Sequence, residues 1–119
     1  MRVVILGASK KAERYSNMAL KRLVAAGHEV LPVNPAFDEI DGIRAYRDLS
    51  AVPLPVDTVT LYVGPGTVLA EADGIFALKP RRIISNPGTE NAEFAARARS
   101  LGVDYLEACT LVLLSTGQF

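Results

Sequence analysis

The feature that most constrains the fold is a repeated alternation of short aliphatic runs with amphipathic segments. The runs are rich in Val, Ile and Leu and lie at residues 2–6, 29–33, 58–62, 82–84 and 104–106. Their apolar character is continuous, which is typical of parallel strands that are covered on both faces. Strands that alternate with helices form a parallel sheet. The sequence therefore predicts an α/β fold with a five-stranded parallel sheet flanked by helices.

Apolar residues at helical spacing predict helices over 16–26, 67–77 and 91–100. Gly74 is expected to weaken the middle helix by about 1 kcal/mol relative to Ala. The segment 34–55 is broken by prolines, and we expect a long crossover there with one helical turn near 46–49. The tail over 108–114 is expected to form a closing helix, with 117–119 frayed.

Length and charge limit the class of protein. With 119 residues, we expect one domain over 1–119. Thirteen basic and thirteen acidic residues balance, so neither nucleic acid nor a membrane is an expected partner. One cysteine, Cys109, and one histidine, His28, exclude a disulfide framework and leave too few ligands for a metal centre. No apolar run at the start is long enough for a signal peptide, so we expect a cytoplasmic protein.

Small, polar and turn-forming residues follow the predicted strands. In an open parallel sheet, ligands bind beyond the carboxyl ends of the strands. The candidate binding residues are therefore those of these loops and of the adjoining start of the first helix: Gly7, Ala8, Ser9, Lys10, Lys11, Arg14, Tyr15, Asn34, Pro35, Gly64, Pro65, Asn86, Pro87 and Gly88.

The first loop combines a glycine with positive charge. Gly7 allows a sharp turn and the close approach of a phosphate to the amides that open the next helix. Lys10, Lys11 and Arg14 add cations at the same place, which favours a multiply phosphorylated ligand. A plain tight turn with solvated surface charges, offset by Glu13, is the alternative.

The standard nucleotide motifs are incomplete. The dinucleotide fingerprint expects three glycines, and this chain has Gly7, Ser9 and Ala12. Asn34 stands where an NAD-binding chain has a carboxylate. The phosphate-binding loop of ATPases, which ends in Gly-Lys-Ser/Thr, is also missing. Ordinary NAD binding is disfavoured, and ATP hydrolysis lacks its usual signature.

No catalytic constellation is visible at the strand ends, so we predict that the chain is not an enzyme. Glu90 is expected to interact with the free amides of a helix start. Cys109 is interpreted as a small buried residue, with a reactive thiol as the alternative. For Tyr15 and Phe94, a position in the core is favoured over stacking on an adenine.

Several strings in order resemble the small CoA-binding proteins, which are similar to the first domain of the succinyl-CoA synthetase alpha subunit. They are Val4-Ile5-Leu6-Gly7-Ala8-Ser9, Arg14-Tyr15-Ser16-Asn17, Val33-Asn34-Pro35, Ile40-Asp41-Gly42, Asn86-Pro87-Gly88-Thr89-Glu90-Asn91 and Glu107-Ala108-Cys109-Thr110-Leu111-Val112. The resemblance implies a Rossmann-like fold in three layers with coenzyme A (CoA) across the strand ends. It places the phosphates near 7–11, the adenosine near Asn34 and Pro35, and the pantetheine along Gly64 and Pro65 toward 86–88. Val63-Gly64-Pro65 departs from relatives that carry a basic residue there.

The function that these observations favour is non-catalytic binding of CoA or an acyl-CoA. One alternative is an enzyme that depends on NAD(P) or another nucleotide, or a redox-responsive nucleotide sensor. Another is an interaction module that binds a protein partner, or a second copy of itself in a homo-oligomer, through the apolar segment 111–114.

Overall fold

The five predicted strands pair into one parallel sheet in the order β2-β1-β5-β6-β7. The computed structural model describes residues 1–119. The strands are β1 (Arg2–Leu6), β2 (Glu29–Val33), β3 (Glu39–Ile40), β4 (Ile43–Arg44), β5 (Thr58–Leu61), β6 (Arg82–Ser85) and β7 (Asp104–Glu107). The helices are α1 (Tyr15–Ala25), α2 (Pro65–Ala70), α3 (Ala72–Ala77), α4 (Ala92–Ser100) and α5 (Thr110–Ser115), with a 3-10 helix η1 (Leu49–Ala51).

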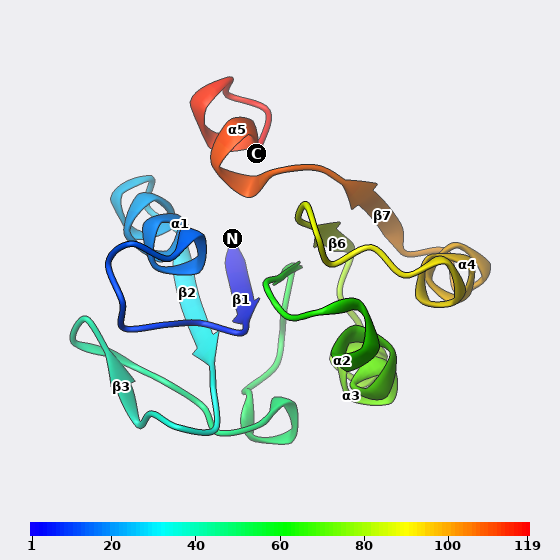
Figure 1. The fold of residues 1–119 in the computed structure, drawn as a ribbon, viewed down its shortest axis with the longest axis horizontal. Coiled ribbons are helices and arrows are strands. Elements are labelled where there is room, and N and C mark those ends of the chain that lie inside the picture. Colours follow the sequence, from blue (N-terminus) through cyan, green and yellow to red (C-terminus); the bar gives the residue numbers. More distant parts are fainter.

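Helices cover both faces of this sheet, as in a Rossmann-like fold. Figure 1 shows α1 and α5 on one face and α2, α3 and α4 on the other. Along β1, Val4 and Leu6 enter the core cluster under α2 to α4, whereas Val3 and Ile5 enter the cluster under α1. Both sets are buried, which explains the continuous apolar character of the strand. None of the helices has the length and hydrophobicity needed to cross a membrane.

The predicted middle helix is wrong in its continuity. The chain forms α2 and α3, which are separated at Glu71, where φ is −91° and ψ is 3°. Gly74 lies inside α3, and a Cβ placed on it would come within 3.2 Å of the Leu49 Cδ1 atom. The glycine therefore lets η1 pack closely against α3.

The crossover holds more structure than predicted. The helical turn forms at Leu49–Ala51 instead of 46–49, and the Asp48 side chain caps it by accepting a bond from the Ala51 amide at 3.1 Å. Tyr46 extends the edge of the sheet, since its amide donates to the Pro32 carbonyl oxygen at 2.8 Å. The hairpin β3-β4 was not predicted. It turns at residues 41 and 42, and such an Asp-Gly pair is a hairpin signal.

The C-terminal residues are ordered by contacts, so the predicted fraying is wrong. Helix α5 begins at Thr110, and the amides of Gln118 and Phe119 both donate to the Leu113 carbonyl oxygen, at 2.8 and 3.1 Å. The Arg82 guanidinium lies 4.4 Å from the centre of the Phe119 ring and donates to the Phe119 backbone oxygen at 2.8 Å. These contacts hold the tail against the amino-terminal edge of the sheet.

His28 lies at that edge, and we expect it to make the stability of the protein depend on pH. Its Nδ1 atom is 3.2 Å from the N-terminal nitrogen, and its ring is 5.2 Å from the Phe119 ring. Partial burial, then the charges of the N-terminus and Arg82, lower the pKa of His28.

As pH falls below about 6.5, the unfolded chain takes up the proton first, so the free energy of unfolding should decrease. Urea unfolding between about pH 7.5 and 5.5 should show this slope, and His28→Gln should flatten it. An equal slope in the variant would contradict the assignment.

Candidate functional site

Gly7 turns the chain sharply at the end of β1, as predicted. Its φ is +90°, which is a conformation that glycine tolerates best. A Cβ at this position would lie 2.7 Å from the Tyr62 carbonyl oxygen and 2.8 Å from the Val63 Cγ1 atom. The Gly7 and Ala8 amides donate to the Val33 carbonyl oxygen at 3.1 and 3.2 Å. Position 7 therefore requires glycine, because the loop packs directly on the end of β5.

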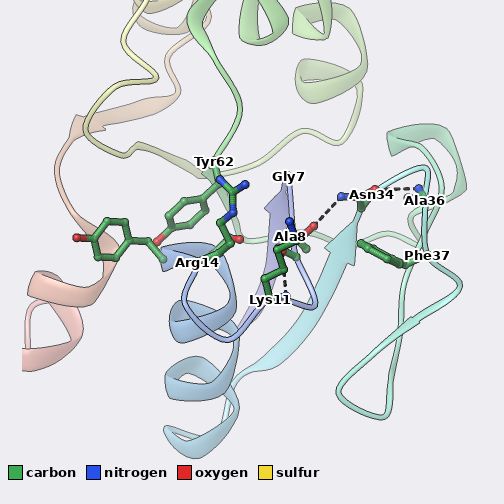
Figure 2. A pocket seen from close by; sticks show the side chains of 11 residues that line it. Gly7, Ala8, Lys11, Arg14, Asn34, Ala36, Phe37 and Tyr62 are labelled. Carbon is green, nitrogen blue, oxygen red and sulfur yellow. Dashed lines mark hydrogen bonds between the residues drawn. The ribbon is translucent and has the colours of Figure 1, made fainter.

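A cavity of about 410 Å³ lies between this loop, the start of α1 and residues 34–37. We call it the loop cavity. Figure 2 shows Arg14 beside Tyr62 on one side and Asn34 with Phe37 on the other. Lys11, Arg14 and Tyr15 line it, and Gly7 and Ala8 form part of its wall. The structure thus brings together the predicted residues of the first loop and of the second strand's end.

The amino end of α1 has hydrogen-bond donors without partners. Its N-cap residue, Arg14, makes no side-chain capping bond, and no acidic residue lies in the first turn. The amides of Tyr15, Ser16, Ser9 and Lys10 have no acceptor within the chain. Free amides at a helix start form an anion site, especially beside cations.

Two cations at the loop cavity are also unpaired. Lys11 and Arg14 take part in none of the four ion pairs of the structure. Lys10 does not itself line the cavity, but its Nζ atom lies 5.0 Å from the centre of the ring of Phe37, which does. The cations that line the cavity directly are therefore Lys11 and Arg14.

Asn34 positions the loops through one donor and one acceptor of its side chain, and it lines both cavities described here. Its Nδ2 atom donates to the Ala8 carbonyl oxygen at 2.7 Å, and its Oδ1 atom accepts from the Ala36 amide at 2.8 Å. These bonds fix the first loop to the segment after β2. A carboxylate at this position could not donate to Ala8, which accounts for an amide here.

The two aromatic candidates separate clearly. Phe94 is fully buried and stacks on Phe76 with ring centres 5.0 Å apart, so it belongs to the core. Tyr15 is 70% exposed and lines the loop cavity, so the expected core position is wrong for this residue. A phenol ring that is free at a cavity can stack on a ligand.

Tyr62 is a site residue that the sequence analysis missed. It follows β5 and lines the loop cavity, yet its hydroxyl is buried without a hydrogen-bond partner. Burial raises the pKa of Tyr62 to about 12. The hydroxyl therefore stays protonated, but it is enclosed on the side of Thr60 and Thr110 and is not open to the cavity. In the sequence it is only the last residue of an apolar run, which gives no signal for this role.

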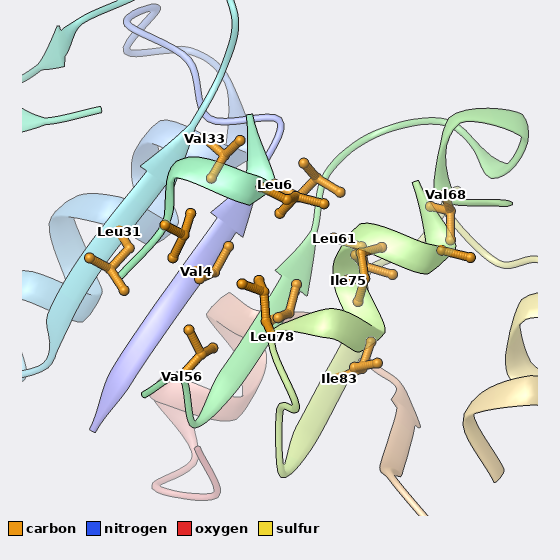
Figure 3. Close-up of a cluster of buried hydrophobic side chains, with 14 of the residues drawn as sticks. Val4, Leu6, Leu31, Val33, Val56, Leu61, Val68, Ile75, Leu78 and Ile83 are labelled. Carbon is orange, nitrogen blue, oxygen red and sulfur yellow. The ribbon is translucent and has the colours of Figure 1, made fainter. Parts of the chain in front are cut away.

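A second cavity, of about 580 Å³, lies on the other side of Gly7 and Asn34. We call it the crossover-side cavity. Most of its walls are apolar: Leu6, Val33, Pro35, Leu49 and Val63. Figure 3 shows Leu6 and Val33 at the upper end of the core cluster from which these walls arise. Arg47, Asp48, Thr67 and Glu71 supply its polar groups. The predicted residues Gly64 and Pro65 open α2 and line neither cavity.

The predicted residues 86–88 do not line either cavity. Asn86 is 2% exposed, and its side chain donates to the Thr60 hydroxyl and to the Leu61 carbonyl oxygen, at 2.7 and 2.8 Å. Its Oδ1 atom accepts from the Thr110 amide at 2.9 Å. Asn86 therefore joins β5, β6 and α5. Pro87 and Gly88 are exposed in the turn that follows.

The remaining titratable candidates lie at the same edge. The carboxylate of Glu90 accepts a bond from the Gly88 amide at 2.8 Å, so the predicted contact is with the loop before α4. The N-cap of α4 is Asn91, whose side chain accepts from the Phe94 amide at 2.9 Å.

Cys109 is half-buried before α5, so it is less enclosed than the predicted core residue. No three His, Cys, Asp or Glu residues are grouped so that they could hold a metal ion.

Comparisons with known proteins agree with this geometry. The sequence model of a family described as "CoA binding domain" matches residues 1–115. A crystal structure of an uncharacterized protein is 41% identical with a TM-score of 0.91, and the match covers 99% of this chain and 97% of that chain.

Two curated proteins match over 61 residues, which is 51% of this chain. Uncharacterized protein YneT of Bacillus subtilis is 36% identical, over 45% of its own length. An ADP-forming acetate–CoA ligase of Methanocaldococcus jannaschii is 33% identical, over 9% of its length. The match thus spans less than half of either relative.

Proposed function

The chain belongs to the family of CoA-binding domains, and we propose that it binds coenzyme A or an acyl-CoA across the carboxyl ends of its parallel strands without catalysing a reaction. The observation that carries this proposal is the amino end of α1. There, free amides and two unpaired cations meet at a cavity that adjoins a second, largely apolar cavity. The likeness to an acetate–CoA ligase supports the same class of ligand.

The diphosphate of CoA fits the loop cavity. Its oxygens would accept bonds from the amides of Tyr15 and Ser16 and interact with Lys11 and Arg14, which have no other anionic partner. Charge-assisted bonds of this kind are about twice as strong as neutral ones. The chain itself supplies no acid to cap α1, so an anionic ligand would complete the helix start.

The adenosine fits the crossover-side cavity, which shares Gly7 and Asn34 with the loop cavity. Its apolar walls suit the two faces of a purine ring, and its polar groups can meet the ring edge. Pro35 lies in this wall, in keeping with the adenosine position that the resemblance to the CoA-binding proteins implies. The pantetheine would run in the other direction, past Gly64 and Pro65 toward the turn at 86–88.

The non-catalytic part of the proposal rests on the residues at the strand ends. Tyr62 remains protonated, Glu90 is engaged with a backbone amide, and Asn34 holds the loops together. The ligase matches over only 9% of its length, so the match supports a related domain and carries no argument for ligase activity. We also propose a cytoplasmic location, where a lone thiol such as Cys109 stays reduced.

Removing the two cations of the loop cavity tests the proposal. The double variant Lys11→Ala/Arg14→Ala should weaken CoA binding by about 2 to 4 kcal/mol, because both side chains would contact phosphate oxygens. Isothermal titration calorimetry measures the loss.

The matched control is Lys21→Ala/Arg22→Ala, which removes the same charge from α1 one turn or more beyond the loop cavity. This control should bind CoA like the wild type at moderate ionic strength. Equal losses in both double variants would mean that only the general field of the helix matters, and would contradict a phosphate site at the loop cavity.

A further inference from the structure

Arg47 is the single cation that lines the crossover-side cavity. Its Nε atom donates to the Asp38 carboxylate at 3.0 Å, and its terminal nitrogens make no hydrogen bond. The side chain is 69% exposed, so these nitrogens are open to a ligand. A guanidinium presents five donors in a planar fork that matches a phosphate group. Most of this capacity is unused here.

The backbone places Arg47 at the carboxyl end of β2. The preceding residue, Tyr46, donates to Pro32 and accepts from the Asn34 amide at 2.9 Å, which makes it a neighbour of the strand's last residue, Val33. In dinucleotide-binding sheets this is where the adenosine ribose lies, and a nearby arginine accommodates a phosphate on that ribose. Asn34 carries no charge, and one donor and one acceptor of its amide already hold the loops.

We propose that Arg47 binds the phosphate monoester on the adenosine ribose, and thereby makes the protein select CoA over dephospho-CoA. This inference rests on the proposed function, because it assumes adenosine in the crossover-side cavity. It adds a specificity determinant on the crossover, distant in sequence from the first loop. The shared chemistry is a ribose phosphate, which is the 3′-phosphate in CoA and the 2′-phosphate in NADP.

Two carboxylates in the same cavity limit the strength of this contact. Asp48 accepts bonds from the Ser50 hydroxyl and the Ala51 amide, and the bond from Ser50 lowers the pKa of Asp48, so the group is ionised. Glu71 lies between α2 and α3. Because Asp48 adjoins Arg47, the variant Asp48→Asn should tighten CoA binding severalfold while it keeps a capping oxygen.

The test compares CoA with dephospho-CoA in calorimetric titrations of the whole chain. The wild type should prefer CoA, and Arg47→Ala should weaken CoA binding about tenfold or more while dephospho-CoA binds within twofold of its wild-type affinity. Arg44→Ala is the matched control, since Arg44 lies 5.2 Å from the Tyr46 ring and does not line this cavity. It should keep the wild-type preference.

Each result separates the inference from the proposed function. If the wild type binds CoA and Arg47→Ala keeps the preference for it, or loses both ligands equally, the role of Arg47 is overturned and the proposed function stands. If the wild type binds neither CoA ligand, both are overturned. Parallel titrations with NADP and NAD identify the other source of a ribose phosphate. A preference for NADP that depends on Arg47, without CoA binding, also overturns selection for CoA.

Discussion

Replacing Gly7 with alanine should lower the free energy of unfolding by about 3 kcal/mol or more. A side chain at φ +90° costs on the order of 1 to 2 kcal/mol. The new Cβ would also sit 2.7 Å from the Tyr62 carbonyl oxygen, so the loop or the end of β5 must shift. Backbone atoms cannot move aside as a flexible side chain can. The shift would also displace Ala8 and the bond that it accepts from Asn34.

Two other glycines divide this cost into its parts. Gly88 has φ +92° with open space around a Cβ, so Gly88→Ala should show the backbone cost alone, about 1 to 2 kcal/mol. Gly66 lies in α2 with neither feature, and Gly66→Ala should be neutral or stabilising by up to about 1 kcal/mol. Urea unfolding of all three variants measures the differences. A cost for Gly7→Ala no larger than that for Gly88→Ala would contradict the close packing of the first loop on β5.

Replacing Asn86 with alanine should cost about 3 kcal/mol or more. The change removes three hydrogen bonds of a buried side chain. It leaves the Thr110 amide and the Leu61 carbonyl oxygen without these partners in the interior, and each unsatisfied group costs about 1 to 3 kcal/mol. Because Thr110 opens α5, that helix should also lose protection against amide hydrogen exchange.

Asn91 provides the matched control for Asn86. It is also an asparagine in the loop that follows β6, and it directly precedes α4. Its side chain caps α4 and donates to the Pro65 carbonyl oxygen at 3.2 Å. It is only half-buried, so water can replace the lost partners. Asn91→Ala should cost about 1 kcal/mol. Equal costs for the two variants would mean that the Asn86 network does not join β5, β6 and α5.

The sequence was sufficient for the sheet because its signal is local. Each strand is a short segment centred on Val, Ile or Leu, and all five segments pair in parallel within one or two residues of their predicted ends. The first helix, predicted over 16–26, is observed at Tyr15–Ala25, since its apolar face and the closing Gly27 are both visible in the sequence. These features need no knowledge of distant contacts.

The features that were predicted wrongly depend on such contacts. The split between α2 and α3 falls at Glu71, whereas the sequence drew attention to Gly74, which is glycine because Leu49 packs against it. The tail is ordered because Phe119 meets Arg82, which is 37 residues earlier in the chain. Neither partner can be identified from the residues near it.

The residues of the candidate site also fall into those that a local sequence pattern predicts and those that depend on distant contacts. Lys11 and Arg14 were found because cations beside a glycine turn and a helix start form a local pattern. Tyr62 was missed because its place at the loop cavity arises only when β5 pairs with β1. Asn86 was identified as a binding residue because it follows a strand, but its buried side chain joins secondary-structure elements, whereas Asn34 both holds the loops and lines the two cavities. The sequence alone does not distinguish an asparagine that is exposed at a strand end from one whose buried side chain hydrogen-bonds to neighbouring elements.

The measurement that tests the central claim most directly is the melting temperature of the purified chain with CoA, acetyl-CoA, NAD, NADPH or ATP and without ligand. A ligand at 100 times its dissociation constant adds about 2.7 kcal/mol of stability, which raises the melting temperature of a domain this size by several degrees. The account predicts a rise with CoA and acetyl-CoA that is absent with NAD. A rise with NADPH alone, or no rise with any of the five compounds, would contradict it.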